Sequence, residues 1–171
     1  MAQFPAAYDF VMGFEDPEKT YAESTDNNGA GVIAGINQAS FPSDFAYINS
    51  IFQPQRGPAI ARFYDSRFWT PLQLGGLESQ DVANRVMDAA VNMGPNTGVK
   101  LLQEAVNALH GNSVGVDGLM GPLTREAANA CDPEALLAAF RTVRGEYYRR
   151  IAIAKPEDQK YLAGWLRRAE A

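Results

Sequence analysis

Apolar residues recur at helical spacing along most of the chain, with turn-rich segments between the stripes. The most regular stripe lies within residues 133–153 and comprises Leu136, Leu137, Phe140, Val143, Tyr147 and Ile151. Because such one-sided spacing is typical of an amphipathic helix, it predicts a helix there. Similar stripes predict helices at about 6–15, 79–92, 97–109 and 158–169. The whole pattern predicts a mostly α fold of around seven helices.

Residues 16–31 break this pattern, since they are rich in Asp, Glu, Ser, Thr, Asn and Gly. That composition predicts a long loop after the first helix, which Pro17 ends. The apolar residues that follow predict a short strand or a buried turn: Val32, Ile33 and Ile36. We therefore expect at most a small β-hairpin, near residues 25–37.

The length of 171 residues suits one compact domain, or two small halves that share a core. The chain is 46% hydrophobic and 20% charged, which is ordinary for a soluble globular protein. Its single cysteine, Cys131, cannot form an internal disulfide and is expected to be a small core residue. His110 is the only histidine, so we expect no zinc site of the usual kind.

Charge is unevenly distributed along the chain. Residues 1–140 hold 16 acidic and 7 basic residues, a net charge of −9, whereas residues 141–171 hold 8 basic and 4 acidic residues, a net charge of +4. Because nucleic-acid phosphates bind basic surfaces, the acidic front part argues against a nucleic-acid partner. The basic tail could favour an anionic polymer or could simply be solvated.

Two acidic residues between positions 11 and 36 are candidates for acid–base chemistry. Glu15 follows three apolar residues and is expected at the end of a short, mostly buried helix. An apolar wall disfavours a charged carboxylate, and so favours the protonated form that a general acid needs. Asp26 precedes a flexible Asn-Asn-Gly-Ala-Gly turn, a wetter setting that should keep it ionised. Glycoside hydrolysis uses two carboxylates in such unlike settings, although a helix-end charge and a turn former would give the same sequence.

This stretch resembles the amino-terminal signature of glycoside hydrolase family 108, which comprises lysozyme-like N-acetylmuramidases of phage and bacterial origin. In that signature an apolar helix ends in Glu-Gly-Gly-Tyr, followed by Asp and then by Gly-Gly-x-Thr-x-x-Gly-Ile. Here Phe14-Glu15 matches the catalytic glutamate, and Tyr21 can stand for the displaced tyrosine. Gly29 together with Gly35-Ile36 matches the closing glycines.

The chain departs from this signature in a longer segment before Gly29 and in the residues at two further points. Asp16 and Pro17 replace the two glycines after the glutamate, and Val32 replaces the threonine. In the similar phage-type lysozymes an aspartate and a threonine orient water, which a valine cannot do. These departures support an alternative function, in which the chain has kept the scaffold and binds the cell wall without turnover.

Further matches to the family follow in the second half of the chain. Residues 88–95, DAAVNMGP, resemble the Asp-x-x-Val-Asn-x-Gly-Pro that leads into its peptidoglycan-binding region. Residues 116–124, VDGLMGPLT, match Val-Asp-Gly-x-x-Gly-Pro-x-Thr, where Asp-Gly makes a tight turn, Gly121 allows close packing and the proline starts a helix. Residues 144–148 and 164–168 resemble the family's Arg-x-x-Tyr-Tyr and Gly-Trp-x-x-Arg.

The resemblance implies a lysozyme-like catalytic lobe at 1–95 and a peptidoglycan-binding helical bundle at 96–171, which could fold as one unit. It implies a muramidase that hydrolyses the β-1,4 bond between N-acetylmuramic acid and N-acetylglucosamine. Glu15 is then the general acid, and Asp26 places water or stabilises the oxocarbenium-like transition state. Further candidates for contacting the substrate are Glu23, Asn28, Asn37, Tyr64 and Trp69. Trp69 could instead fill the core together with Phe68, and no metal or organic cofactor is implied.

Two alternatives of a different class stay open: a catalytically impaired wall-binding or assembly module, and a regulatory partner of a secretion system. The expected partner is the glycan strand of peptidoglycan, and nothing demands more than a monomer. The amino terminus has no basic segment followed by an apolar run, so we expect no signal peptide. No stretch approaches the length of a membrane span. We therefore expect synthesis in the cytoplasm and action on the cell wall or in the periplasm after release or export.

Overall fold

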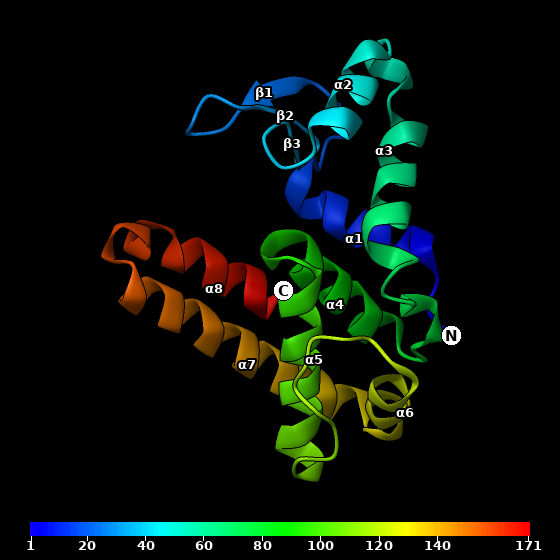
Figure 1. Cartoon of the computed structure of the whole chain (residues 1–171), viewed down its shortest axis with the longest axis vertical. Coiled ribbons are helices and arrows are strands. Elements are labelled where there is room, and N and C mark those ends of the chain that lie inside the picture. Colours follow the sequence, from blue (N-terminus) through cyan, green and yellow to red (C-terminus); the bar gives the residue numbers. More distant parts are fainter.

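The computed structural model describes residues 1–171 and consists mainly of helices, as predicted (Figure 1). The α-helices are α1 (Phe4–Glu15), α2 (Pro42–Ser50), α3 (Gly57–Tyr64), α4 (Gln80–Met93), α5 (Pro95–His110), α6 (Pro122–Ala130), α7 (Pro133–Ala154) and α8 (Leu162–Glu170). Shorter helical turns are η1 (Gln53–Gln55), η2 (Asp65–Trp69), η3 (Leu74–Gly76) and η4 (Pro156–Tyr161). The single helix predicted at 158–169 is thus divided into η4 and α8. No helix combines the length and the apolar character that crossing a membrane requires.

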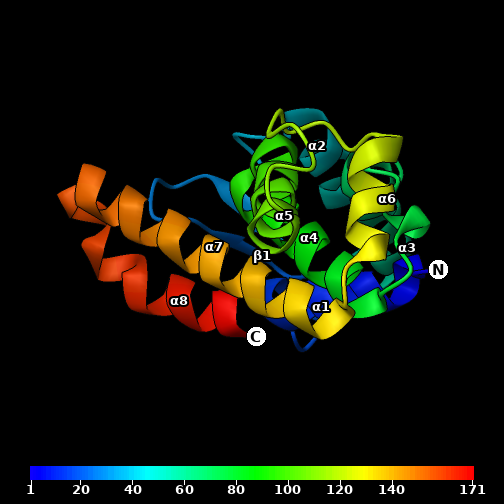
Figure 2. The same ribbon diagram turned by 90° about the horizontal axis from the view of Figure 1, so that it is seen from below.

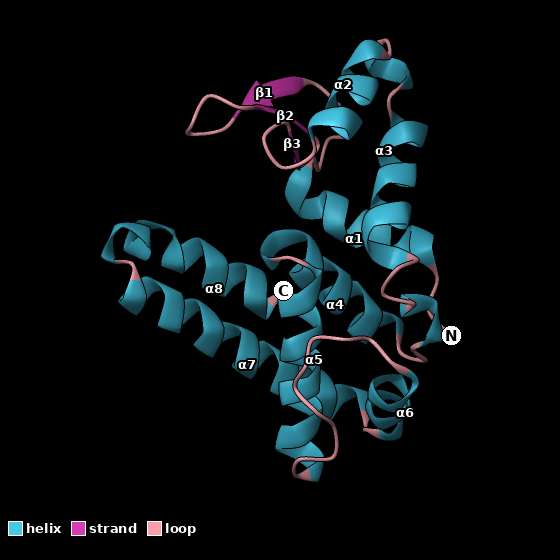
Figure 3. Cartoon of the chain, viewed as in Figure 1, coloured by secondary structure: helices cyan, strands magenta, loops and turns pink.

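One small antiparallel sheet accompanies the helices, in the order β1-β2-β3 (Figure 3). Its strands are β1 (Glu23–Thr25), β2 (Gly31–Ile33) and β3 (Ile36–Asn37). Glu23 lies opposite Ile33, and Val32 lies opposite Asn37. The small β element predicted near residues 25–37 is confirmed, and it begins two residues earlier, inside the predicted loop.

Local sequence signals explain where the longer helices begin. The Ser79 side chain accepts a hydrogen bond from the backbone N–H of Val82 at the start of α4, and the Asp132 side chain accepts one from Ala135 at the start of α7. Such caps satisfy backbone donors that the first turn of a helix leaves free. Proline occupies the first turn of α5, α6 and α7, where its missing N–H costs nothing.

One hydrophobic core joins the front and back parts of the chain. It contains 33 buried residues contributed by elements from α1 to α7. α4 lies between α1 and α5, and α5 packs in turn against α7. α7 and α8 form an antiparallel pair that extends from this core toward the side of the β-sheet (Figures 1 and 2).

The buried face of α7 departs from the predicted stripe along its second half. Leu136 and Phe140 are buried as predicted, but further along the helix the buried side chains are Arg144, Tyr148 and Ala152. Their neighbours Val143, Tyr147 and Ile151 are only partly buried. The buried face in the second half of α7 is therefore shifted by one residue along the sequence. Arg144 occupies the inward position that the apolar spacing assigns to Val143.

Candidate active site

Glu15 is the last residue of α1 and is held by an ion pair. Val11 and Met12, one turn before it, are completely buried and fix the helix against the core. The Glu15 side chain is 17% exposed, and its Oε1 accepts a hydrogen bond of 2.6 Å from Nη2 of Arg168 in α8. The predicted apolar wall is therefore wrong on this side of the carboxylate, where a guanidinium group lies instead.

The second carboxylate oxygen of Glu15 lies against the turn between β2 and β3. A β-carbon placed on Gly35 would be 2.5 Å from Oε2 of Glu15 and 2.8 Å from the hydroxyl oxygen of Tyr64. That hydroxyl donates a 2.7 Å hydrogen bond to the carbonyl oxygen of Ala34. Burial raises the pKa of Tyr64 well above its usual value, and the nearby charge of Glu15 raises it further. Tyr64 is therefore a neutral donor that holds the turn beside the carboxylate.

Arg168 joins Glu15 to a buried carboxylate, Asp88, in α4. The Nε and Nη2 atoms of Arg168 donate to Asp88 Oδ1 at 3.0 and 2.7 Å. Asp88 Oδ2 lies 2.7 Å from Nη2 of Arg144, which is 1% exposed. Burial lowers the pKa of the Arg168 guanidinium, but hydrogen bonds and charges from Asp88 and Glu15 raise it by more, so the net shift is upward. The guanidinium is therefore a fixed positive charge.

The network continues through α7 to the end of α4. Arg144 donates to the hydroxyl of Tyr148 at 3.1 Å, and this hydroxyl donates to Oδ1 of Asn92 at 2.6 Å. The ring of Tyr148 stacks on Trp165 of α8 at a centroid distance of 5.4 Å. Four helices thus meet around Asp88, and each polar group has a partner, which is the condition for burying charges.

Asp26 organises the turn between β1 and β2. Its Oδ1 accepts hydrogen bonds from the backbone N–H groups of Asn28 and Ala30 at 2.8 and 2.9 Å, and its Oδ2 accepts one of 2.7 Å from Asn37. These bonds, chiefly those from Ala30 and Asn37, lower the pKa of Asp26, so the group stays ionised. In this structure the contacts of Asp26 are therefore those of a turn former, the alternative considered for this residue.

The other predicted substrate contacts fall into exposed and buried groups. Glu23 and Asn28 are exposed, and Glu23 accepts a 3.1 Å hydrogen bond from Asn49. Tyr64 is 1% and Trp69 8% exposed, so both belong to the core, which for Trp69 was the alternative considered. Asn37 has both side-chain ends engaged, with Asp26 and with the backbone of residues 39 and 40.

The front part of the chain contacts the η4–α8 segment at a second point besides the Glu15–Arg168 pair. The Asn27 side chain, in the turn between β1 and β2, donates a 3.2 Å hydrogen bond to the hydroxyl of Tyr161, the last residue of η4. Glu15 and Arg168 make the other contact, at the opposite end of α8. The η4–α8 segment therefore contacts the β1–β2 turn near its beginning and the end of α1 near its end.

The sequence motifs contain Arg168, Asp88 and Arg144. They do not indicate that these three side chains contact one another in the fold. Three of the four motifs of the second half each contribute one charged member of the network. A usable signal was the charge at position 88, which interrupts the apolar run from Val86 to Ala90. A charge on the inward face of a helix needs a buried partner.

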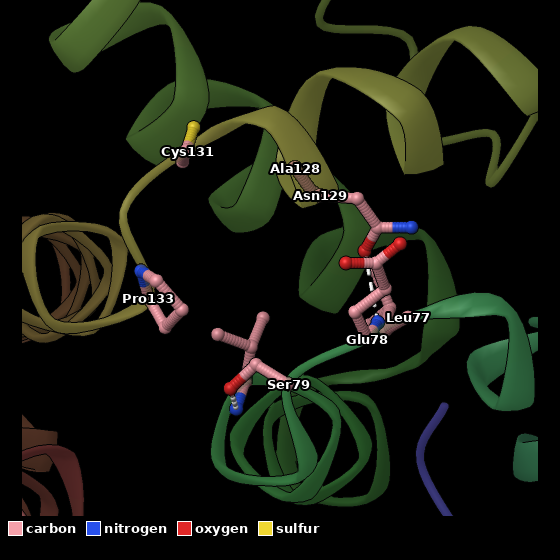
Figure 4. Close-up of a pocket in the computed structure, with 8 residues that line it drawn as sticks. Leu77, Glu78, Ser79, Ala128, Asn129, Cys131 and Pro133 are labelled. Carbon is pink, nitrogen blue, oxygen red and sulfur yellow. Dashed lines mark hydrogen bonds between the residues drawn. The ribbon is translucent and has the colours of Figure 1, made fainter.

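None of the cavities in the structure is lined by Glu15. One of about 170 Å³ lies between the start of α4 and the end of α6 (Figure 4). Its Asn129 is engaged by the backbone of Glu78 and Gly76, and the sulfur of Cys131 points away from Ser79 and Pro133. Burial raises the pKa of the Cys131 thiol, so it stays protonated. No group of three His, Cys, Asp or Glu residues is placed to hold a metal ion.

The segment of residues 116–124, which ends in the first turn of α6, is built around a buried glutamine. Gln103 of α5 donates to Asp117 Oδ1 at 2.8 Å and accepts a hydrogen bond from the backbone N–H of Gly118 at 2.9 Å. Gly118 has φ of +77°, as the predicted Asp-Gly turn requires. A β-carbon on Gly121 would meet nothing within 4 Å, so the close packing predicted at that glycine is wrong.

A cavity of about 310 Å³ opens on this segment, beside Leu119 and Leu123. These two apolar side chains are 66% and 76% exposed. Exposed apolar residues grouped at a cavity mark a candidate binding surface.

Two family models match the chain, and together they span most of it. The family described as Glycosyl hydrolase 108 matches residues 10–94, and the family described as Predicted Peptidoglycan domain matches residues 97–170. Among solved structures, Brucella abortus SagA is similar over 97% of this chain and 92% of its own, with a TM-score of 0.65 and 17% sequence identity. That likeness shows a shared fold. No curated protein matches the chain.

Proposed function

We propose that the protein is a muramidase. Its residues 10–94 belong to the glycosyl hydrolase 108 family, and residues 97–170 are a predicted peptidoglycan domain. These two assignments make the chain a glycosidase directed at peptidoglycan. In this proposal it hydrolyses the β-1,4 bond between N-acetylmuramic acid and N-acetylglucosamine, in the cell wall. The division into a catalytic lobe at 1–95 and a binding region at 96–171 belongs to the same proposal. The observation that carries it is the position of Glu15, a partly exposed carboxylate fixed at the end of α1.

Glu15 acts in this mechanism as the general acid that protonates the glycosidic oxygen. Asp26, held ionised by its hydrogen bonds, stabilises the positive charge that develops on the sugar ring or places the attacking water. Asn37 keeps Asp26 in place through its 2.7 Å hydrogen bond. The exposed side chains Glu23 and Asn28 are available for sugar hydroxyl or N-acetyl groups, whereas Tyr64 and Trp69 support the site from the core.

The predicted peptidoglycan domain supplies a place for the polymer to bind. We assign this role to the cavity of about 310 Å³ beside the 116–124 segment, where Leu119 and Leu123 are exposed. Polar groups such as Asp117 and Ser113 line the same cavity. A mixture of apolar and polar lining suits a polymer that carries both sugar rings and short peptides.

The decisive experiment measures release of reducing sugar from purified peptidoglycan by wild type, Glu15→Gln and Glu18→Gln. Glu18 is exposed and has no side-chain hydrogen bond, so its variant is a matched control for loss of one carboxylate near the end of α1. We expect wild type and Glu18→Gln to cut and Glu15→Gln to be inactive, with all three folded by circular dichroism. Mass spectrometry of borohydride-reduced products identifies the bond, since a muramidase leaves N-acetylmuramic acid at the reducing end.

A second variant separates the two roles of Asp26. Asp26→Asn keeps an oxygen that can accept from Asn28 and Ala30 but removes the charge. A folded, inactive Asp26→Asn would support a catalytic carboxylate, and full activity would leave Asp26 as a turn former only. If folded wild type and Glu15→Gln both sediment with peptidoglycan and neither releases sugar, the wall-binding module replaces the enzyme.

A further inference from the structure

We propose that Arg168 positions the Glu15 carboxylate and determines which of its two oxygens carries the transferred proton. The carboxy-terminal helix α8 then completes the active site, and the second region does more than bind the polymer. The inference rests on the proposed function, since it assumes that Glu15 is the general acid. It assigns a role to a residue that lies outside the region matched by the glycosyl hydrolase family.

Two groups hold the guanidinium of Arg168 besides Glu15: one in its plane and one across its face. In its plane, Nε and Nη2 donate to the carboxylate of Asp88, which has no exposed surface. Across its face, the guanidinium carbon lies 4.7 Å from the centroid of the Phe14 ring. Because planar donors and a cation–π contact fix both position and tilt, the group is a rigid support for its next partner.

Asp88 is itself held by another helix, so the position of the Arg168 guanidinium does not depend on α8 alone. Arg144 of α7 binds its other oxygen at 2.7 Å, and Tyr148 holds Arg144 in turn. Trp165, one turn before Arg168 on the same helix, stacks on the ring of Tyr148. A network buried in this way is costly to open, because removing one charge leaves its partner unpaired. This rigidity favours a permanent positioning role over a contact that opens and closes.

The chemistry of the pair then decides where the proton resides. A guanidinium has donors only and is never deprotonated in a protein, so Oε1 of Glu15 must act as an acceptor toward it. The proton of the acid form is consequently carried by Oε2. On that side lie Gly35, whose missing side chain leaves room, and the Tyr64 hydroxyl, whose hydrogen is already donated to Ala34. Arg168 thus directs the acidic hydrogen of Glu15 away from α8 and toward the β2–β3 turn.

The test compares steady-state hydrolysis of soluble peptidoglycan fragments by full-length wild type, Arg168→Ala, Arg168→Lys and Arg167→Ala. Arg167 is exposed on the same turn of α8 and has no side-chain hydrogen bond, so its variant controls for charge and helix propensity. We expect Arg168→Ala to lower kcat about 100-fold with little change in KM, because the acid is misplaced while the substrate still binds. Arg168→Lys should recover part of kcat, since an ammonium restores one donor but not the planar fork. Arg167→Ala should match wild type.

Chemical rescue distinguishes positioning from a structural role. Guanidinium ion, added at concentrations too low to unfold the protein, should raise the kcat of Arg168→Ala and leave that of Glu15→Gln unchanged. A folded Arg168→Ala with unchanged kcat would overturn the proposal. A higher kcat would also overturn it, because Arg168 would then restrain the acid. If Arg168→Ala does not fold, Arg168→Lys and Arg167→Ala decide the matter: equal kcat values would refute positioning.

The failure of this inference and the failure of the proposed function give different results. If wild type releases no sugar, Glu15 is not a general acid in this protein, and the proposed role of Arg168 is refuted with it. If wild type is active and Glu15→Gln is not, the function stands, and the Arg168 variants test the positioning alone.

Discussion

Gly35 and Glu15 approach each other so closely that the two positions constrain one another. A β-carbon at position 35 would lie 2.5 Å from Oε2 of Glu15, closer than carbon and oxygen atoms can pack. Gly35 also has φ of +77°, in the left-handed region that glycine enters without strain. The turn between β2 and β3 is therefore shaped around the carboxylate at the end of α1.

Replacing Gly35 should consequently damage the site as well as the turn. We expect Gly35→Ala to abolish most activity, because Glu15 must move, and to lower the free energy of unfolding. Gly29→Ala is the matched control, since Gly29 has φ of +83° but open space where the β-carbon would lie. Both variants carry the left-handed penalty of about 1–2 kcal/mol, so their difference isolates the contact with Glu15. Equal activity of the two folded variants would show that the contact is unimportant.

Asp88 is expected to contribute more to stability than any exposed acid of the same helix. Asp88→Ala leaves Arg144 and Arg168 without their shared partner, so the free energy of unfolding should fall by about 3–5 kcal/mol. Asp81→Ala, also in α4, removes an exposed partner of Arg85 at 3.6 Å and should change stability by less than about 1 kcal/mol. Urea unfolding measures both values. Similar losses for the two variants would mean that the buried network adds little.

Asp117, in the segment of residues 116–124, should make stability depend on pH. Hydrogen bonds from the backbone of Leu119 and from Gln103 hold the pKa of Asp117 below its usual value, which returns to about 3.9 in the unfolded chain. A lowered native pKa stabilises the fold above the unfolded value, and the effect is lost as pH falls through the native value. Asp117→Asn should therefore be less stable than wild type at pH 7, with a difference that shrinks below about pH 4. Urea unfolding across this range measures it, and a difference that grows toward acid would contradict the prediction.

Leu123 should be needed for attachment to the wall if the adjacent cavity binds peptidoglycan. Leu123→Glu places a charge on this apolar surface and should weaken cosedimentation with insoluble peptidoglycan about tenfold, which corresponds to about 1.4 kcal/mol. Ile153→Glu is the control, because Ile153 is 79% exposed on α7 and lines no cavity. Hydrolysis of small soluble fragments should be unaffected in both. Equal binding by the two variants would place the wall contact elsewhere.

The sequence by itself determined the local structure and the first candidate residue. Helical periodicity, caps and prolines depend on neighbours within a turn, so they placed the long helices from Ser79 to Ala154 and the β element near Asn37. The same local signals placed Glu15 at the end of α1 and Asp26 in a turn. They could also indicate that the charge at Asp88 needed a partner.

Only the tertiary structure decided what surrounds these residues. Glu15 and Arg168 are 153 residues apart, and their ion pair depends on how α1, α4, α7 and α8 pack together. The same packing buries Tyr64, and it places Arg144 on the buried face of α7. Apolar spacing determines that a helix has a buried face. The partner charge on another helix decides which of two adjacent residues lies on that face. A single sequence contains the two charges and not the distance between them.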